Sequence, residues 1–288
     1  MDRTTWLCSY QNDKTKKQAV CAISCFDKFL KDNNTTEELF FDNLKQKKDT
    51  NEKYIQVQKF INYQVTNKAS PNSIRNYWVF IKNWFWFNGV TFAQEEIKAF
   101  LKFPRPMKDL KEPMTREVVK LIIDNAEEPY KTCFLILASS GMRLHEALSI
   151  SINSIDWGEP PLKPTAILLS PEITKYSTGR QVYISRQASE HLERYLDDYL
   201  KLKQPTVEEY FSRLRKKLGL TERYSNGRNF KIHIHAFKSF FMSEASLVHD
   251  YKYSHALGGH TEYLPEYFRT TRDKRDQMYL ELEPIVTF

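Results

Sequence analysis

The second half of the sequence contains side chains whose types suit chemistry on an anionic group. Guanidinium and ammonium groups bind anionic oxygens, imidazole exchanges protons near neutral pH, and a phenol can act as a nucleophile. In chain order these residues are Arg143, Lys175, His235, Lys238, His260 and Tyr267. Each of them alone is more often a surface or packing residue, so their order and local setting carry the interpretation.

These residues stand at expected boundaries of secondary structure. Arg143 follows a glycine turn at Gly141 and opens a short apolar helix. Lys175 lies between two stretches that read as strands, 166–169 and 181–184. His235 heads a further helix. The pattern predicts a small antiparallel sheet with a lysine in its turn region, set among helices.

Helices account for most of the remaining pattern in this second part. Thr115 is the expected N-cap of one helix, and residues 130–139 form a second that ends at Gly141. Residues 192–200 are helical, and Thr206-x-x-Glu209 predicts a capping box that starts a helix ending at Gly219. Residues 234–282 are mostly helical.

The first part of the chain reads as helix throughout. Apolar residues at helical spacing mark 14–31, and Ser70-Pro71 begins a helix that Asn88-Gly89 ends. This helix carries apolar residues at helical spacing along one face, and three aromatic residues widen that face. They are expected in the core: Trp84, Trp86 and Phe87. Lysines in the first turn of 14–31 are either solvated or face a phosphate backbone, because the helix dipole disfavours cations there. They are Lys14, Lys16 and Lys17.

A proline-rich, charged stretch separates the two parts. Prolines stand at positions 104, 106 and 113, with basic and acidic residues between them, as in a stiff solvated linker. The predicted fold is mainly α with a small antiparallel β-sheet: a helical domain at 1–103, a linker at 104–113 and an α+β domain at 114–288.

Composition narrows the functional classes. The net charge of +7 and pI near 9.0 favour a polyanionic partner, of which nucleic acid is the commonest. No apolar run is long enough to span a bilayer, so we expect a cytoplasmic, nucleoid-associated protein with no membrane partner.

The cysteines lack metal spacing and are expected to be buried and reduced. They are Cys8, Cys21, Cys25 and Cys133.

Together these motifs resemble the catalytic domain of the tyrosine recombinases, the phage integrase family, along nearly all of residues 114–288. The family signature is an arginine, a hairpin lysine, His-x-x-Arg, a Leu-Gly-His element and a C-terminal tyrosine. The helical part at 1–103 resembles the family's DNA core-binding domain more loosely. The resemblance implies double-stranded DNA as partner, a homotetramer on two DNA sites, and C-terminal segments exchanged between neighbours.

The resemblance also implies a role for each residue. Tyr267 attacks the scissile phosphate and forms a 3′-phosphotyrosyl link without metal or cofactor. Arg143 binds the non-bridging oxygens, and Glu146, one helical turn later, orients it. Lys175 protonates the departing oxygen, and His235 assists the attack. His260 and Lys238 bind the phosphate. Independently of the resemblance, we expect Arg180 to join Lys14, Lys16 and Lys17 as a DNA-binding cation.

Two departures from the family pattern bear on activity. Lys238 stands where the family usually has its second arginine, and the gap from His260 to Tyr267 is two residues shorter than usual. Tyr263 and Tyr279 are the other candidate nucleophiles. The sequence therefore predicts a site-specific DNA recombinase or integrase of a mobile element, or a chromosome-dimer resolving enzyme. A catalytically weak or inactive DNA-binding homologue and a type IB topoisomerase-like relaxing enzyme are the alternatives.

Overall fold

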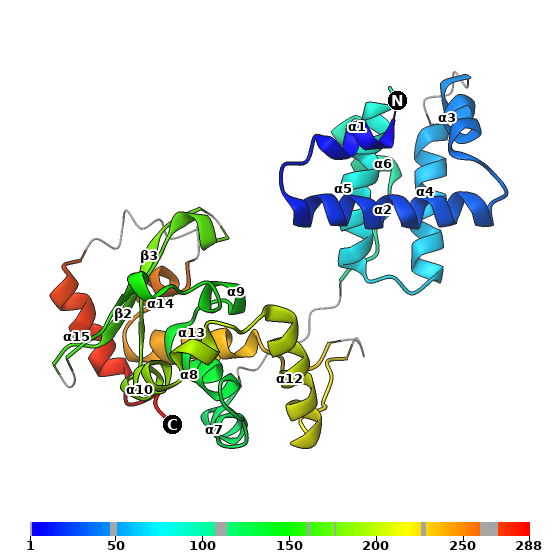
Figure 1. The fold of residues 1–288 in the computed structure, drawn as a ribbon. Coiled ribbons are helices and arrows are strands. Elements are labelled where there is room, and N and C mark those ends of the chain that lie inside the picture. Colours follow the sequence, from blue (N-terminus) through cyan, green and yellow to red (C-terminus); the bar gives the residue numbers. More distant parts are fainter. Residues whose placement is uncertain are drawn as a thin grey trace. The chain divides into compact units, whose positions relative to one another are not determined.

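The computed structural model describes residues 2–46, 51–106, 114–159, 162–175, 177–225, 229–259 and 270–288 (Figure 1). The chain divides into two compact units, Met1–Lys108 and Asp109–Phe288. Most of the expected linker at 104–113 falls on residues 107–113, which lie outside the described residues.

Unit 1 is helical wherever its residues are described. Its elements are α1 (Arg3–Cys8), α2 (Asp13–Asp32), α3 (Glu37–Gln46), α4 (Glu52–Thr66), α5 (Pro71–Phe87) and α6 (Gln94–Phe100). The ends of α5 follow from local sequence: the Ser70 hydroxyl accepts a hydrogen bond from the Ser73 N–H at 3.0 Å, and Pro71 occupies the first turn. After the helix, Gly89 adopts a positive φ of 84°.

Aromatic side chains form the core of unit 1. The ring of Phe26 meets those of Phe40, Phe60 and Phe85 edge to face, with centroids 5.3–5.7 Å apart. The core assignment was wrong for Trp86, which is 65% exposed. Two residues advance a helix by about 200°, so burial of Trp84 turns Trp86 toward solvent.

The cysteines are free, but their expected burial was wrong for most of them. Cys133 is buried, Cys25 is half-buried, and Cys8 and Cys21 are exposed. On α2 the apolar face carries Ala22 and Phe26 into the core, so its other face takes Cys21 to solvent.

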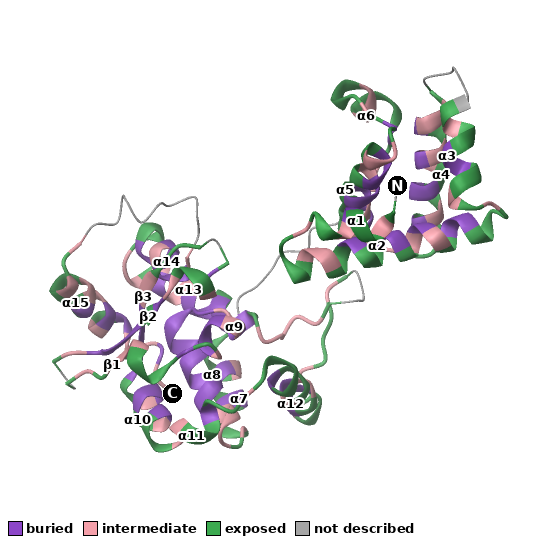
Figure 2. Cartoon of the chain, turned by 45° about the horizontal axis from the view of Figure 1, so that its top comes forward, coloured by how far each residue is buried: buried purple, intermediate pink, exposed green. Residues whose placement is uncertain are grey.

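Unit 2 surrounds one apolar helix. Its helical elements are α7 (Arg116–Asp124), α8 (Tyr130–Ser140), α9 (Leu144–Ala147), η1 (Ile152–Ser154), η2 (Pro171–Ile173), α10 (Arg186–Arg194), α11 (Leu196–Tyr199), α12 (Gln204–Lys217), α13 (Ala236–Val248), α14 (Tyr251–Gly258) and α15 (Arg272–Leu282). Residues 132–140 of α8 are all buried (Figure 2). No helix within the described ranges is long and apolar enough to cross a membrane.

A small antiparallel sheet packs against this helical core. Its strands lie in the order β1 (Ile155–Asp156), β2 (Thr165–Leu169) and β3 (Arg180–Ile184). The central register pairs Ile167 with Val182. The two longer strands were predicted from their β-branched and apolar runs, whereas β1 has only two residues and was not.

The expected capping box at Thr206 was wrong. The helix begins earlier, at Gln204, and Pro205 lies within its first turn, with no side-chain cap at Lys203. Proline suits this position because the first helical N–H groups have no partner inside the helix.

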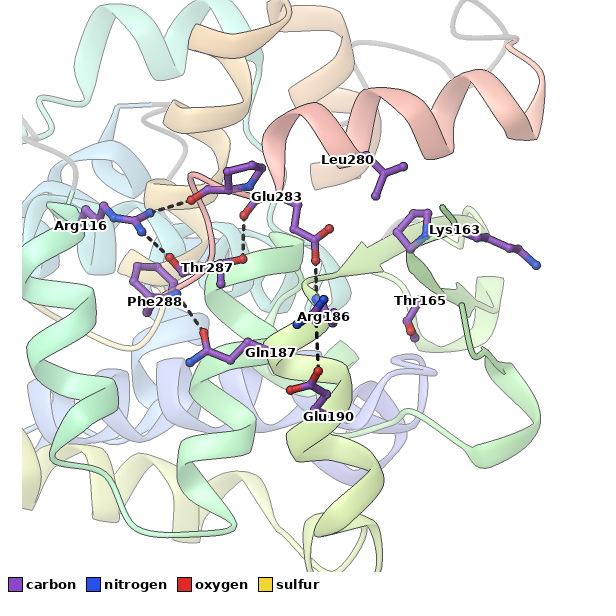
Figure 3. Close-up of a pocket in the computed structure, with 12 residues that line it drawn as sticks. Arg116, Lys163, Thr165, Arg186, Gln187, Glu190, Leu280, Glu283, Thr287 and Phe288 are labelled. Carbon is purple, nitrogen blue, oxygen red and sulfur yellow. Dashed lines mark hydrogen bonds and ion pairs between the residues drawn. The ribbon is translucent and has the colours of Figure 1, made fainter. Parts of the chain in front are cut away.

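The C-terminal tail folds back onto its own unit. Tyr279, Leu282 and Val286 are fully buried. The Arg116 guanidinium donates to the Ile285 and Thr287 carbonyls, and a pocket of about 660 Å³ lies beside them (Figure 3). The resemblance implies that C-terminal segments are exchanged between neighbours, whereas in this chain the apolar tail packs on its own unit.

Candidate active site

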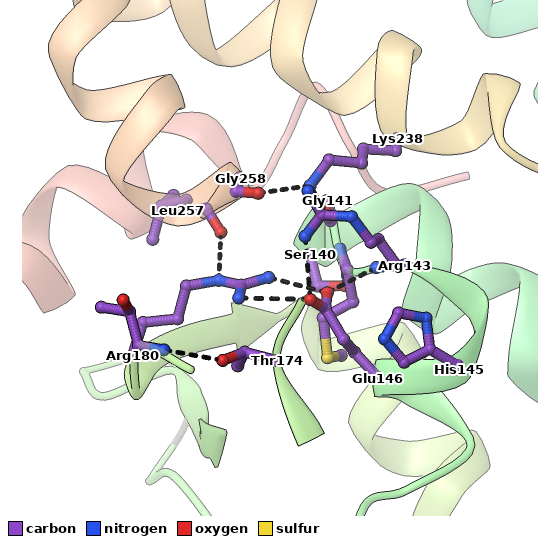
Figure 4. A network of polar contacts seen from close by, with 12 residues as sticks. Ser140, Gly141, Arg143, His145, Glu146, Thr174, Arg180, Lys238, Leu257 and Gly258 are labelled. Atoms are coloured by element: carbon purple, nitrogen blue, oxygen red, sulfur yellow. Dashed lines mark hydrogen bonds and ion pairs between the residues drawn. The ribbon is translucent and has the colours of Figure 1, made fainter. Parts of the chain in front are cut away.

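A buried carboxylate joins two arginines at the centre of the site. Glu146 Oε1 accepts a hydrogen bond from Arg143 Nη1 at 2.9 Å, and Glu146 Oε2 accepts one from Arg180 Nη2 at 2.7 Å (Figure 4). The side chain of Glu146 is 0% exposed, against 14% for Arg143 and 8% for Arg180. The expected contact between Glu146 and Arg143 is thus present, and Arg180 adds a second cation.

The backbone before Arg143 fixes the direction of this side chain. Gly141 ends α8 in the left-handed conformation, with φ of 66°. A Cβ at this position would lie 2.4 Å from the Phe241 ring, so only glycine fits. The Glu146 carboxylate also accepts the Arg143 N–H at 2.7 Å, which caps α9.

Lys238 lies at the same centre but contacts backbone carbonyls. It is 5% exposed, and its Nζ donates to the Gly141 carbonyl at 2.7 Å and the Gly258 carbonyl at 2.6 Å. Burial, followed by the positive charges of Arg143 and Arg180, lowers the pKa of Lys238 to about 7.

The cluster carries an excess of positive charge. Arg143, Arg180 and protonated Lys238 face one carboxylate, Glu146. Burial opposes ionisation of Glu146, but the hydrogen bond and charge of Arg180 outweigh it, so the pKa of Glu146 is lowered and the group stays ionised. Buried charge of one sign is unfavourable unless it is paired, so the arrangement suits an added anion.

The remaining described candidates are His235, which lies close enough to feel the charges of Lys238 and Arg143, and Lys175. His235 is the exposed N-cap of α13. Protein atoms around its ring, followed by the charge of Lys238, lower its pKa below the ordinary 6.5, so it is neutral at pH 7 and able to accept a proton. Lys175 is exposed between η2 and β3, where a long flexible amine can reach a ligand.

The candidate nucleophile lies outside the described residues, as do His260 and Tyr263; the undescribed segment is 260–269, which includes Tyr267. Tyr279 is described and is a poor candidate. It is 0% exposed, its hydroxyl donates to the Ser139 carbonyl at 2.8 Å, and burial raises its pKa well above 10.

The predicted DNA-binding cations fall into two settings. Lys14 and Lys17 are exposed on α2, and Lys16 beside them is half-buried. Arg180, by contrast, is almost completely buried and contributes to the polar centre. Its position at the start of β3, beside the predicted hairpin, was the signal that could have placed it there.

Two further features of the site were not predicted. They are the Leu257 carbonyl, which accepts from Arg180 Nε at 2.9 Å, and the Gly258 carbonyl bound by Lys238. Backbone acceptors carry no side-chain signature, so only the fold reveals them. No group of three or more His, Cys, Asp or Glu side chains within the described ranges could hold a metal ion.

Similar folds occur among solved structures of DNA-bound recombinases. A lambda integrase (75–356) dimer bound to a COC′ core site is 13% identical, with a TM-score of 0.65 over 94% of this chain and 100% of that one. XerH site-specific recombinase bound to palindromic difH, a post-cleavage complex, is 17% identical, with a TM-score of 0.59 over 91% and 78%. The Tn1549 transposon integrase with transposon right-end DNA is 13% identical, with a TM-score of 0.54 over 79% and 84%.

These likenesses establish the fold, which is that of the tyrosine recombinases. In sequence, residues 112–244 match the model of the phage integrase family, a stretch that contains Arg143, Lys175, His235 and Lys238. The matched stretch lies within unit 2. Among curated proteins, no sequence matches the chain significantly.

Proposed function

We propose that this chain is a site-specific DNA recombinase or integrase of a mobile element, which cleaves and rejoins DNA through a 3′-phosphotyrosyl intermediate. The observation that carries the proposal is the buried cluster of Arg143, Arg180 and Lys238 around the single carboxylate of Glu146. A phosphodiester is the anion that this excess charge, together with the match of residues 112–244 to the phage integrase family model, favours.

The proposed reaction needs no external energy source. The Tyr267 oxygen attacks phosphorus while its proton passes to neutral His235, directly or through a water. The bond from phosphorus to the 5′-oxygen breaks, and Lys175 protonates that oxygen as it leaves. Arg143 stabilises the charge that gathers on the non-bridging oxygens, assisted by His260. Attack by a 5′-hydroxyl from another strand reverses these steps and reseals the DNA.

The proposed partner is duplex DNA, bound by two domains, 1–103 and 114–288, on either side of the 104–113 linker. Exposed Lys14 and Lys17, with Lys16, supply phosphate contacts. Arg180 serves to hold Glu146 and not as a surface DNA contact, because its side chain is 8% exposed. By likeness to the lambda integrase dimer on a core site and tetramer on a Holliday junction, we propose a homotetramer on two sites, acting in the cytoplasm at the nucleoid.

A DNA-binding homologue without catalysis is the second candidate. The observation in its favour is that Lys238, at the position of the family's second arginine, binds two backbone carbonyls. Its amine is therefore engaged before any phosphate arrives.

Covalent trapping tests the proposal. A binding site is first selected from random duplexes at low salt, then built into a nicked substrate from which the leaving strand diffuses away. Wild type is expected to form a protein–DNA adduct that Tyr267→Phe abolishes while it keeps DNA binding. Tyr263→Phe and Tyr279→Phe serve as matched controls that retain the adduct. Binding without an adduct in wild type favours the inactive homologue, and relaxation of plasmids irrespective of site favours a topoisomerase.

A further inference from the structure

The C-terminal end of α14 is capped by two cations from other elements. Arg180 of β3 donates from Nε to the Leu257 carbonyl at 2.9 Å, and Lys238 of α13 donates to the Gly258 carbonyl at 2.6 Å. The last carbonyls of a helix lack partners within it, and its C-terminal end attracts positive charge. Two adjacent carbonyls therefore hold two distant basic side chains.

The same two cations reach the backbone and carboxylate that fix Arg143. Lys238 Nζ also donates to the Gly141 carbonyl at 2.7 Å, two residues before Arg143. Arg180 also pairs with Glu146 at 2.7 Å, and Glu146 in turn binds Arg143. Each cation thus joins the end of α14 to the turn or the carboxylate that orients Arg143 (Figure 4).

We propose that Arg180 and Lys238 are positioning residues that form a clamp between Arg143 and the end of α14. The clamp is defined by four contacts: Lys238 to Gly141 and Gly258, and Arg180 to Leu257 and Glu146. The residues that follow Gly259 in sequence include His260 and Tyr267. On the proposed function, the clamp sets the start of the nucleophile's segment relative to the phosphate-binding arginine.

Lysine is the residue type that this geometry requires at position 238. Two carbonyl oxygens converge on a single nitrogen at 2.6 and 2.7 Å, in a setting that is 5% exposed. An ammonium is a compact donor that can serve both, whereas a guanidinium is a wide planar fork. The backbone at Gly141 cannot move aside for a guanidinium, since the Phe241 ring packs directly against this glycine.

The clamp and a direct phosphate-binding role give opposite expectations for Lys238→Arg. If Lys238 bound the phosphate, arginine would match or exceed it, because the fork makes a bidentate contact. If Lys238 is a clamp, arginine overfills the site and separates the two carbonyls. We expect Lys238→Arg to form the covalent adduct about 10- to 100-fold more slowly than wild type, the effect of losing one or two charge-assisted hydrogen bonds.

The first test uses the free protein and no DNA. Hydrogen–deuterium exchange is measured in peptides covering 136–143 and 251–259 for wild type, Lys238→Met, Lys238→Arg and the control Lys252→Met, which changes an exposed lysine of α14. Faster exchange in both peptides for the two Lys238 variants, with the control unchanged, supports the clamp. Unchanged exchange in Lys238→Arg, the variant that keeps its charge, overturns it.

The second test uses single-turnover adduct formation with DNA affinity measured alongside. The clamp predicts slower adduct formation in Lys238→Arg and Lys238→Met at unchanged affinity. Adduct formation by Lys238→Arg at the wild-type rate or above overturns the clamp. If wild type itself gives no adduct while exchange rises in both variants, the proposed function fails and the clamp stands.

Discussion

Each unit contains an ion-pair cluster, and the two clusters have opposite charge ratios. In unit 1, Arg3 lies between two carboxylates, Asp27 at 2.8 Å and Glu37 at 2.9 Å, and all three side chains are 27–45% exposed. In unit 2, one carboxylate, Glu146, lies between Arg143 and Arg180 and is 0% exposed. The first cluster ties α1 to α2 and α3, and the second leaves positive charge unbalanced.

The pKa values follow the same contrast. Hydrogen bonds from Arg3 to Asp27, and then to Glu37, raise the pKa of Arg3 further above its ordinary range. Lys238 lies beside two arginines, and its pKa falls to about 7. A cluster that stabilises the charged form of its cation has a structural role. A cluster that disfavours the charged form of its cations is suited to bind an added anion.

Glu146→Gln removes the negative charge that pairs with both arginines of the second cluster. We expect it to cause the largest loss of stability among the substitutions considered. Arg143 and Arg180 would be left buried without a counter-charge, so unfolding of unit 2 should become easier by about 3–5 kcal/mol. The measurement is urea unfolding followed by circular dichroism, at fixed salt and pH.

The matched substitution in unit 1 is Arg3→Gln. Its partners are partly exposed and can be hydrated, so we expect a loss of about 1 kcal/mol or less. Comparable losses for both substitutions would show that the two clusters do not differ as their burial indicates.

Added sulfate or phosphate should further stabilise wild-type unit 2 and leave unit 1 unaffected.

The pH dependence of stability sharpens the comparison further. The pKa of Lys238 is about 7 in the folded protein against an ordinary 10.5. Between pH 7 and 10.5 the unfolded chain binds more protons at this lysine than the folded chain does. The free energy of unfolding therefore falls as the pH is lowered from 10.5 to about 7, and above pH 10.5 this group no longer affects it. Stability of unit 2 should therefore gain up to about 1.4 kcal/mol per pH unit from this group between pH 7 and 10.

The difference between wild type and Lys238→Met isolates this effect from other titrations. Urea unfolding at pH 7, 8 and 9 should show a slope that the variant lacks. Lys175→Met, at an exposed lysine, should keep the wild-type slope. Equal slopes in wild type and Lys238→Met would mean that the Lys238 charge is compensated in the folded state.

Much of the fold could be predicted because local signals agree with it. Ser70-Pro71 and Gly89 bound α5, Thr115 precedes α7, and the apolar runs gave β2 and β3. Each of these depends on capping chemistry or on periodicity within a few residues. The short strand β1 and the start of α12 lacked such signals, since two residues show no period and Pro205 displaced the expected cap.

The site could be predicted as a set of residues but not as a network. Glu146 was expected to orient Arg143 because both lie on one helical turn. The links from Arg180 to Leu257 and from Lys238 to Gly258 span 77 and 20 residues and end on backbone oxygens. Such contacts depend on how β3, α13 and α14 pack together, and neither residue type nor spacing encodes that.

A final prediction concerns the exposed cations of unit 1, where the expected effects are smallest. One face of α2 presents lysines to solvent at helical spacing: Lys14, Lys17, Lys28 and Lys31. The nearby carboxylate of Asp27 is neutralised by Arg3. These lysines are well placed to contact phosphates along the DNA backbone, in contrast to the buried cations of unit 2.

Each contact of this kind releases counterions, so Lys14→Gln and Lys17→Gln should each reduce the slope of log affinity against log salt by about 0.9. The measurement is a fluorescence-anisotropy titration of duplex DNA at several salt concentrations, with Lys98→Gln as control because Glu95 and Glu96 precede it on α6. The reduction should be the same for any DNA sequence, since phosphate contacts do not read bases. An unchanged slope in both variants would leave Lys14 and Lys17 as solvated residues. A loss confined to one DNA sequence would instead place this face in a groove.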